Sequence, residues 1–136
     1  MKRGLMAVFA LMLGLSWTAM SLSAHHSFAS QFDPSQPIEF EGVIKGVEWR
    51  NPHIWLYVDV TDASGRVVTW GFSGAPPSTL ARRGITQEQL KAGELVKVAG
   101  FRARDGSNNA SGGSVTFADG RNVFTASSED AVPGQE

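Results

Sequence analysis

The sequence predicts a small all-β barrel, built as one domain with a single short helical insert. With 136 residues, the chain is long enough for one core and too short for a second. Several short segments alternate between apolar and polar residues and are separated by turn residues, which is typical of strands. Helix signals are confined to one stretch between the third and fourth of these segments.

The N-terminal residues are predicted to lie outside the folded domain. Lys2 and Arg3 come first, Leu5–Leu15 is a run of apolar residues and glycine, and small residues lead up to Ala24. That order is typical of a secretory signal peptide over residues 1–24. The apolar run is shorter than the ~20 residues of a membrane-spanning helix, although an uncleaved anchor is the alternative. We expect a periplasmic or secreted protein with no membrane span after cleavage.

The first two strands follow an irregular arm. Residues 25–37 form this arm, because they contain the turn signals Asp33-Pro34-Ser35 and Gln36-Pro37. The first strand is predicted over 38–49, with a bulge near Gly42, where the apolar positions change face. The second strand is predicted over 53–61. It alternates strictly, so its apolar side chains should fill the barrel and the intervening ones should face outward.

The remaining elements are predicted in the order strand, helical segment, strands. A third strand spans 66–72, and a helix opening at Pro76-Pro77 closes at Gly84. A further helical turn begins at Thr86, which forms a capping box with Gln89. The later elements are a strand over 94–102, a mobile loop over 103–113, two short strands over 114–118 and 121–126, and a polar tail over 127–136.

This order is that of a five-stranded oligonucleotide/oligosaccharide-binding barrel, the OB-fold. The prediction is therefore a single OB-like barrel of five to six strands over residues 38–126, with the helical insert between strands three and four. Another small barrel or sandwich with an inserted helix is the alternative.

Composition excludes several classes of function. The formal net charge is −1, and loss of Lys2 and Arg3 makes the mature chain more acidic, so no nucleic-acid footprint is expected. The chain has no Cys, and all four Met lie in the first twenty residues. A mature chain without sulfur has no disulfide, no thiolate nucleophile and no soft ligand for Cu(I). No catalytic constellation is recognisable either.

The three histidines are the candidate metal ligands. His25 and His26 directly follow the predicted signal peptide, and His53 follows Pro52 at the entry to the second strand. If cleavage follows Ala24, the free amine and imidazole of His25 chelate a metal, and His26 and His53 supply further nitrogens. If cleavage follows Ser23, His26 becomes the third residue of an amino-terminal Cu(II)/Ni(II)-type motif. Nitrogen ligands favour Cu(II), with Zn(II) as the second choice. The alternative is a solvated histidine pair, with His53 only bonding its own turn.

Aromatic residues surround the same turn. Trp49, Asn51, Trp55 and Tyr57 lie where an OB barrel binds its ligands, on the outer face of strands two and three and on the first loop. They predict contacts with a carbohydrate, a peptide or a periplasmic protein partner. The alternative is that the aromatics pack beneath the arm over 25–37, which would bring His25 and His26 towards His53.

Several motifs resemble a family of small secreted bacterial proteins, domain of unknown function 6152. The motifs are His25-His26-Ser27-Phe28-Ala29, Glu48-Trp49-Arg50-Asn51-Pro52-His53, Leu80-x-Arg82-Arg83-Gly84, Leu90-Lys91-Ala92-Gly93-Glu94 and Ala118-Asp119-Gly120-Arg121. The resemblance spans residues 24–124. It implies export and one compact domain and supplies no activity, but it places all three histidines inside family motifs. The chain lacks the acidic residue that commonly follows the third-strand Trp in this family.

Two classes of function follow from these patterns. The first is an exported metal-binding protein that holds Cu(II) through His25, His26 and His53. The second is an OB-like binding module without a metal role, whose contacts are Trp49, Asn51, Trp55 and Tyr57.

Overall fold

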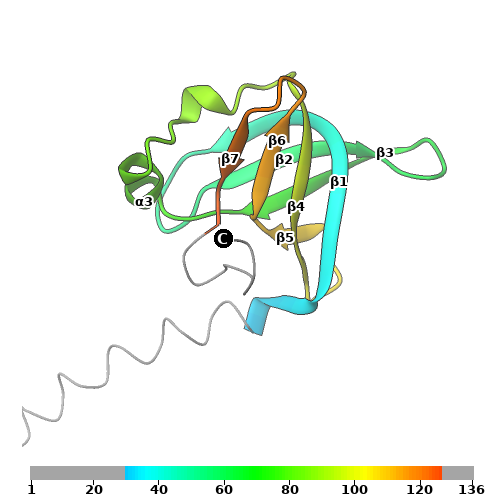
Figure 1. Ribbon diagram of the computed structural model, residues 1–136. Helices are drawn as coiled ribbons and strands as arrows, with labels where there is room; N and C mark the ends of the chain where they lie inside the picture. Colours follow the sequence, from blue (N-terminus) through cyan, green and yellow to red (C-terminus); the bar gives the residue numbers. More distant parts are fainter. Residues whose placement is uncertain (1–29, 127–136) are drawn as a thin grey trace, which may run out of the picture.

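The computed structural model describes residues 30–126. Seven strands form one sheet, and the helical segment leaves it between the third and fourth strands (Figure 1). The elements are β1 (Phe32–Glu48), β2 (Trp55–Thr61), β3 (Val67–Ser73), α3 (Pro77–Arg82), the 3₁₀ turn η1 (Gln87–Gln89), β4 (Leu95–Ala103), β5 (Asn109–Ser111), β6 (Ser114–Phe117) and β7 (Asn122–Phe124). The predicted signal peptide, His25 and His26, and the predicted tail over 127–136 lie outside the described residues.

The sheet closes into a five-stranded barrel. The strand order is β1-β2-β3-β5-β4, and an additional pairing between β1 and β4 closes it. β3 and β5 run parallel, whereas the other pairs are antiparallel. This is the order of an OB barrel, so the predicted fold class is confirmed. The hairpin of β6 and β7 pairs with the first part of β4, at Val96–Val98, on the same edge that β5 contacts at Arg102.

The first strand makes closure possible because it bends. Its first part, up to Val43, pairs with β4, and the part from Val43 onward pairs with β2. At Gly42 a Cβ would lie only 2.5 Å from the carbonyl oxygen of Asp59, so glycine permits this close approach. The bulge predicted there is displaced: the pairing with β2 shifts between Ile44 and Gly46.

The prediction of an irregular arm over 25–37 is wrong for residues 32–37, which belong to β1. β1 begins at Phe32, which is buried and pairs with Ala103 of β4. The expected turn is still present inside the strand. Asp33 accepts hydrogen bonds from the backbone and hydroxyl of Ser35, and the register shifts before pairing resumes at Pro37. The partner strand, which lies far away in sequence, extends β1 past these turn residues.

The barrel interior follows the predicted alternation on β2. Its apolar side chains are buried together with residues from β1, β3, β4, β6 and the helical segment. The inward set on β2 and the residue before it comprises Ile54, Leu56, Val58 and Val60. The outward positions are half-buried or exposed, as the period of two requires.

The helical segment covers one end of the barrel. α3 starts with proline in its first turn, and Gly84 follows its end with φ +74°. In the next turn, the side chain of Gln89 accepts a hydrogen bond from the backbone of Thr86 at 3.1 Å, as the capping box predicts. Leu80 and Leu90 are buried in the core, so these two short turns are held by packing.

The prediction of a mobile loop over 103–113 is wrong in part, because this segment contains β5. Ala110 and Ser111 are buried, and β5 pairs in parallel with β3. Gly, Asn and Ser are common in loops, and the parallel partner lies some forty residues away, so no local pattern announces this strand.

Candidate functional site

The turn between β1 and β2 holds His53 in a defined orientation. The turn contains a cis peptide bond between Asn51 and Pro52. The Nδ1 atom of His53 lies 2.9 Å from the carbonyl oxygen of Gly74, just beyond the end of β3. Because a carbonyl only accepts, Nδ1 must carry the proton, and in the neutral ring Nε2 then has a free lone pair. The side chain is exposed, so Nε2 is accessible for an external ligand.

A hydrogen bond from the second ring nitrogen to a carbonyl is the arrangement that commonly orients metal-binding histidines. Within residues 30–126, no group of three or more His, Cys, Asp and Glu side chains could hold a metal ion. A three-histidine site therefore depends on His25 and His26, which lie outside the described part of the chain.

Trp55 and Tyr57 lie on the outer face of the barrel, as predicted. Both side chains are half-buried. Tyr57 is paired with Gly46 on one side and with Gly71 on the other. A Cβ at Gly71 would lie 3.3 Å from ring carbons of Trp55, so the indole covers this glycine. The two glycines leave room for aromatic rings to lie on the sheet.

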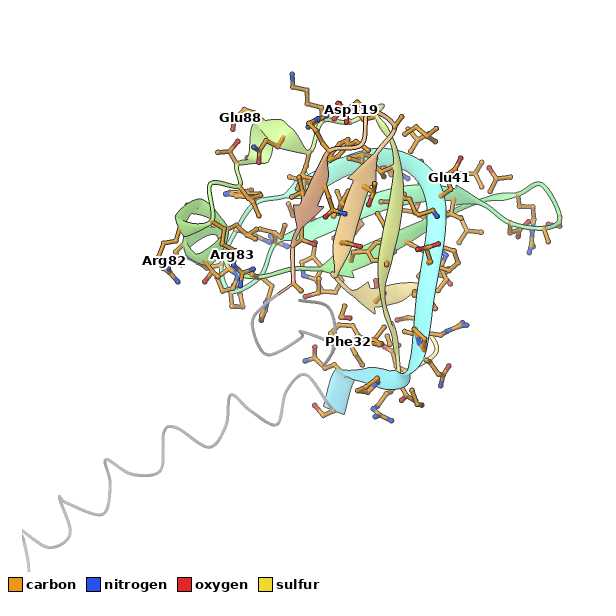
Figure 2. The ribbon with its side chains drawn as sticks, viewed as in Figure 1. Phe32, Glu41, Arg82, Arg83, Glu88 and Asp119 are labelled. Carbon is orange, nitrogen blue, oxygen red and sulfur yellow. The ribbon has the colours of Figure 1, made fainter. Side chains whose placement is uncertain are left out.

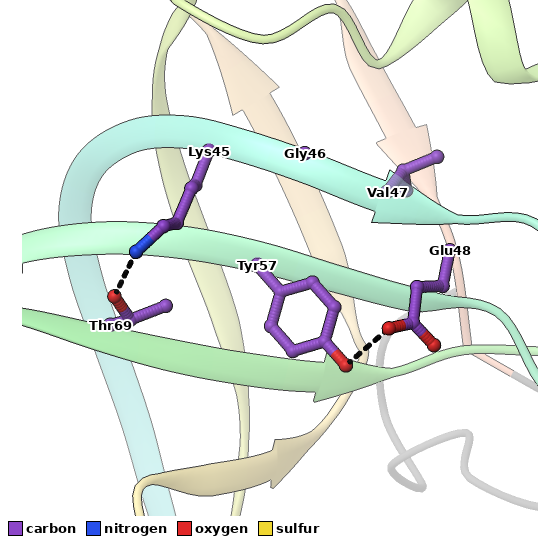
Figure 3. A pocket seen from close by; sticks show the side chains of 6 residues that line it. All are labelled: Lys45, Gly46, Val47, Glu48, Tyr57 and Thr69. Atoms are coloured by element: carbon purple, nitrogen blue, oxygen red, sulfur yellow. Dashed lines mark hydrogen bonds between the residues drawn. The ribbon is translucent and has the colours of Figure 1, made fainter.

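A polar network surrounds Tyr57 (Figure 3). Its hydroxyl donates a hydrogen bond to Oε1 of Glu48 at 3.2 Å, and Arg50 forms an ion pair with Oε2 of Glu48 at 2.6 Å. Burial of the hydroxyl, together with the negative charge of Glu48, raises the pKa of Tyr57. Nearby, the ammonium of Lys45 donates to the hydroxyl of Thr69 at 2.9 Å.

The same network continues along the outer face. Thr69 donates to a carboxylate oxygen of Asp59, and Lys45 lies 3.6 Å from that oxygen. A shallow hollow of about 500 Å³ is bordered by Lys45, Gly46, Val47, Glu48, Tyr57 and Thr69. Each charged group on its border has a partner of opposite charge: Lys45 has Asp59, and Glu48 has Arg50. The sequence did not indicate this network, because the bulge beside Lys45 decides which β1 side chains face outward.

The other predicted contact residues occupy different environments. Trp49 is partly buried and packs against the core, whereas Asn51 is exposed in the turn. The described part of the arm does not cover Trp55 and Tyr57, because it pairs with β4. Figure 2 shows Phe32 beside the lower end of β4, on the side of the barrel away from α3.

The fold and the oriented turn histidine define a small OB-type barrel protein with an exposed imidazole at one end. The chain belongs to the Family of unknown function (DUF6152), whose model matches residues 13–113. No curated protein and no solved structure matches the chain. Within residues 30–126, no helix has the length and apolar character to cross a membrane.

Proposed function

We propose that the protein is an exported metal-binding protein that holds Cu(II) through His25, His26 and His53. Cleavage after Ala24 supplies the free amine of His25, and the amine and imidazole of that residue form a chelate ring. Zn(II) is the weaker candidate, because Cu(II) heads the affinity order for nitrogen ligands. The site belongs to the periplasm or the extracellular space, where the signal peptide directs the chain.

The observation that carries the proposal is the hydrogen bond between Nδ1 of His53 and the carbonyl of Gly74. It fixes the tautomer that offers Nε2 to a metal, and the exposed position of the ring leaves room for ligands from the N-terminus. The absence of Cys, and of Met after the first twenty residues, favours the oxidised ion.

The test uses protein exported and processed by a bacterial host. Mass spectrometry first identifies the N-terminal residue, which should be His25. Calorimetric titration with Cu(II), with glycine as competitor, should then give one tight site, and paramagnetic resonance should show several coupled nitrogens. A synthetic peptide of residues 25–30 is the reference, and Cu(II) binding no tighter than that peptide's contradicts the proposal.

Two variants separate the ligands. His53→Gln keeps an amide that can donate to Gly74 and removes the imidazole, so Cu(II) affinity should fall about tenfold or more, which corresponds to a loss of at least ~1.4 kcal/mol of binding free energy. Three glycines inserted before His25 leave all three histidines, separate the amine from the His25 imidazole and put no histidine in the third position, so this insertion should weaken binding as well. Unchanged affinity in His53→Gln rules out His53 as a ligand.

The second candidate function is a binding module that uses the outer face. The half-buried Trp55 and Tyr57 beside the hollow favour it, because aromatic rings on a sheet surface suit sugar rings. Magnetic resonance titration with a panel of oligosaccharides should move the amides of β2 and β3 if this function is correct. Tyr57→Ala should then abolish the shifts, and Cu(II) binding should be unaffected.

A further inference from the structure

A second hollow lies at the opposite end of the barrel, between the β2–β3 hairpin and the outer parts of β1 and β4. We name it the barrel mouth, and its volume is about 590 Å³. Its apolar wall consists of Phe40, Val60, Val68 and Trp70. The rings of Phe40 and Trp70 lie 4.6 Å apart at 44°, and they come from β1 and β3, which do not pair. Their contact therefore bridges the barrel interior.

Arg102 is the unusual residue of the barrel mouth. It is half-buried, and the central carbon of its guanidinium lies 5.6 Å from the centre of the Trp70 ring. The other six arginines within residues 30–126 each have a hydrogen bond or an ion pair. Arg102 has neither with any described residue. A guanidinium partly withdrawn from water without a counter-charge gains from binding an anion.

The neighbouring charges leave the barrel mouth positive. Arg66 lies on the hairpin and binds Asp62, with Nη2 at 3.0 Å and Nε at 3.1 Å from one carboxylate oxygen. Asp62 also accepts hydrogen bonds from the backbone of Ser64 and Arg66, so its charge is compensated locally. Two arginines thus face one carboxylate, and Arg102 supplies the uncompensated positive charge.

We propose that the barrel mouth binds a small amphipathic carboxylate. The apolar ring or chain of this ligand contacts Phe40, Val60 and Val68, and its carboxylate pairs with the guanidinium of Arg102. A planar guanidinium matches a carboxylate through two parallel hydrogen bonds, and a single free cation suits a ligand with one charge. The site is independent of the proposed metal function, because it lies at the other end of β2 from His53.

The experiment compares 2-naphthoate with its neutral analogue 2-naphthalenemethanol and with acetate. Backbone amide shifts of the full mature protein are recorded with a chelator present, so that metal binding plays no part. Naphthoate should move the amides of residues 60–70 and 100–102, with an affinity about tenfold or more above that of the alcohol. Equal binding of the alcohol, shifts confined to the outer face, or no shift at millimolar naphthoate overturns the proposal.

Two arginine variants sharpen the test. Arg102→Gln should weaken naphthoate binding to the level of the alcohol and leave the alcohol unaffected. Arg82→Gln removes the same charge from the exposed surface of α3, at the far side of the barrel (Figure 2), and should change nothing. If Arg102→Gln does not fold, Arg102→Lys is the second variant. It keeps the positive charge but cannot form the two parallel hydrogen bonds of a guanidinium, so it should bind naphthoate with intermediate affinity. Undiminished binding in folded Arg102→Gln overturns the proposal.

Discussion

The two ends of the barrel differ in how completely they are covered. At the end near α3, Leu80 and Ile54 are each 0% exposed, and Leu90 and Ala75 complete a sealed apolar layer. At the barrel mouth, Val60 and Trp70 are each 8% exposed. Arg102 lies over the Trp70 ring there, whereas α3 covers the other end. Strands β2 and β3 run from one end of the barrel to the other, so the difference between the ends comes from the segments that connect the strands. A helical insert seals one end, and a tight hairpin leaves the other open.

The largest loss of stability is expected from a substitution at the sealed end, next to α3. Leu80→Ala removes a fully buried side chain and leaves a cavity, so it should lower the free energy of unfolding by about 2–5 kcal/mol. Val68→Ala at the barrel mouth removes half-buried methyl groups and should cost only ~1 kcal/mol. Urea denaturation of both variants measures the difference. Equal losses would show that the two ends are equally packed.

The second prediction concerns the close contact between β4 and β5, with Gly100 as the test position and Gly46 as the control. At Gly100, on β4, a Cβ would overlap the carbonyl oxygen of Ser111 in β5, so Gly100→Ala should destabilise the protein by about 1–3 kcal/mol. Gly46→Ala is the control, because nothing lies within 4 Å of a Cβ there. Thermal unfolding compares them. A harmless Gly100→Ala would contradict the tight β4–β5 contact.

The third prediction concerns the outer face near the sealed end. Tyr57 is the chain's single tyrosine, so absorbance at the tyrosinate band follows its ionisation alone. Its midpoint should lie above the ordinary value of 10.0. Glu48→Gln removes the carboxylate charge but leaves the burial of the hydroxyl, so it should lower the midpoint without restoring it fully.

This pKa also has a consequence for stability. The folded state binds the phenolic proton more tightly than the unfolded chain does, so the stabilisation is complete below pH 10.0 and declines as the pH rises through the folded-state pKa. Urea midpoints measured on either side of this range should fall in the wild type and fall less in Glu48→Gln. An equal decline in both would assign the loss to other groups.

The smallest effect is expected at the hairpin of the barrel mouth. Asp62 accepts hydrogen bonds from the backbone of Ser64 and Arg66, and the bond from the Ser64 hydroxyl is the main reason that the pKa of Asp62 is lowered. Asp62→Asn should therefore speed hydrogen exchange of these two amides and leave the amides of the sealed end unchanged. Faster exchange throughout the barrel would mean that the hairpin supports the whole fold.

The sealed end was largely predictable from the sequence, and the barrel mouth was not. Proline, Gly84 and the Thr86–Gln89 pair are local signals, because each satisfies or ends a helical turn within a few residues. The meeting of Phe40, Trp70 and Arg102 depends on strands that are separated in the chain. Its geometry follows from register, which the sequence pattern leaves open.

The sequence by itself determined the strand alternation on β2, the order of elements and the candidate metal ligands, because period, caps and residue chemistry are local properties. Tertiary structure alone decided the extension of β1 to Phe32, the short strand β5 and the bulge beside Lys45. It also decided that His53 binds Gly74 and that Arg102 has no polar partner within residues 30–126. These features depend on hydrogen bonds and packing between distant segments, which only closure of the barrel brings together.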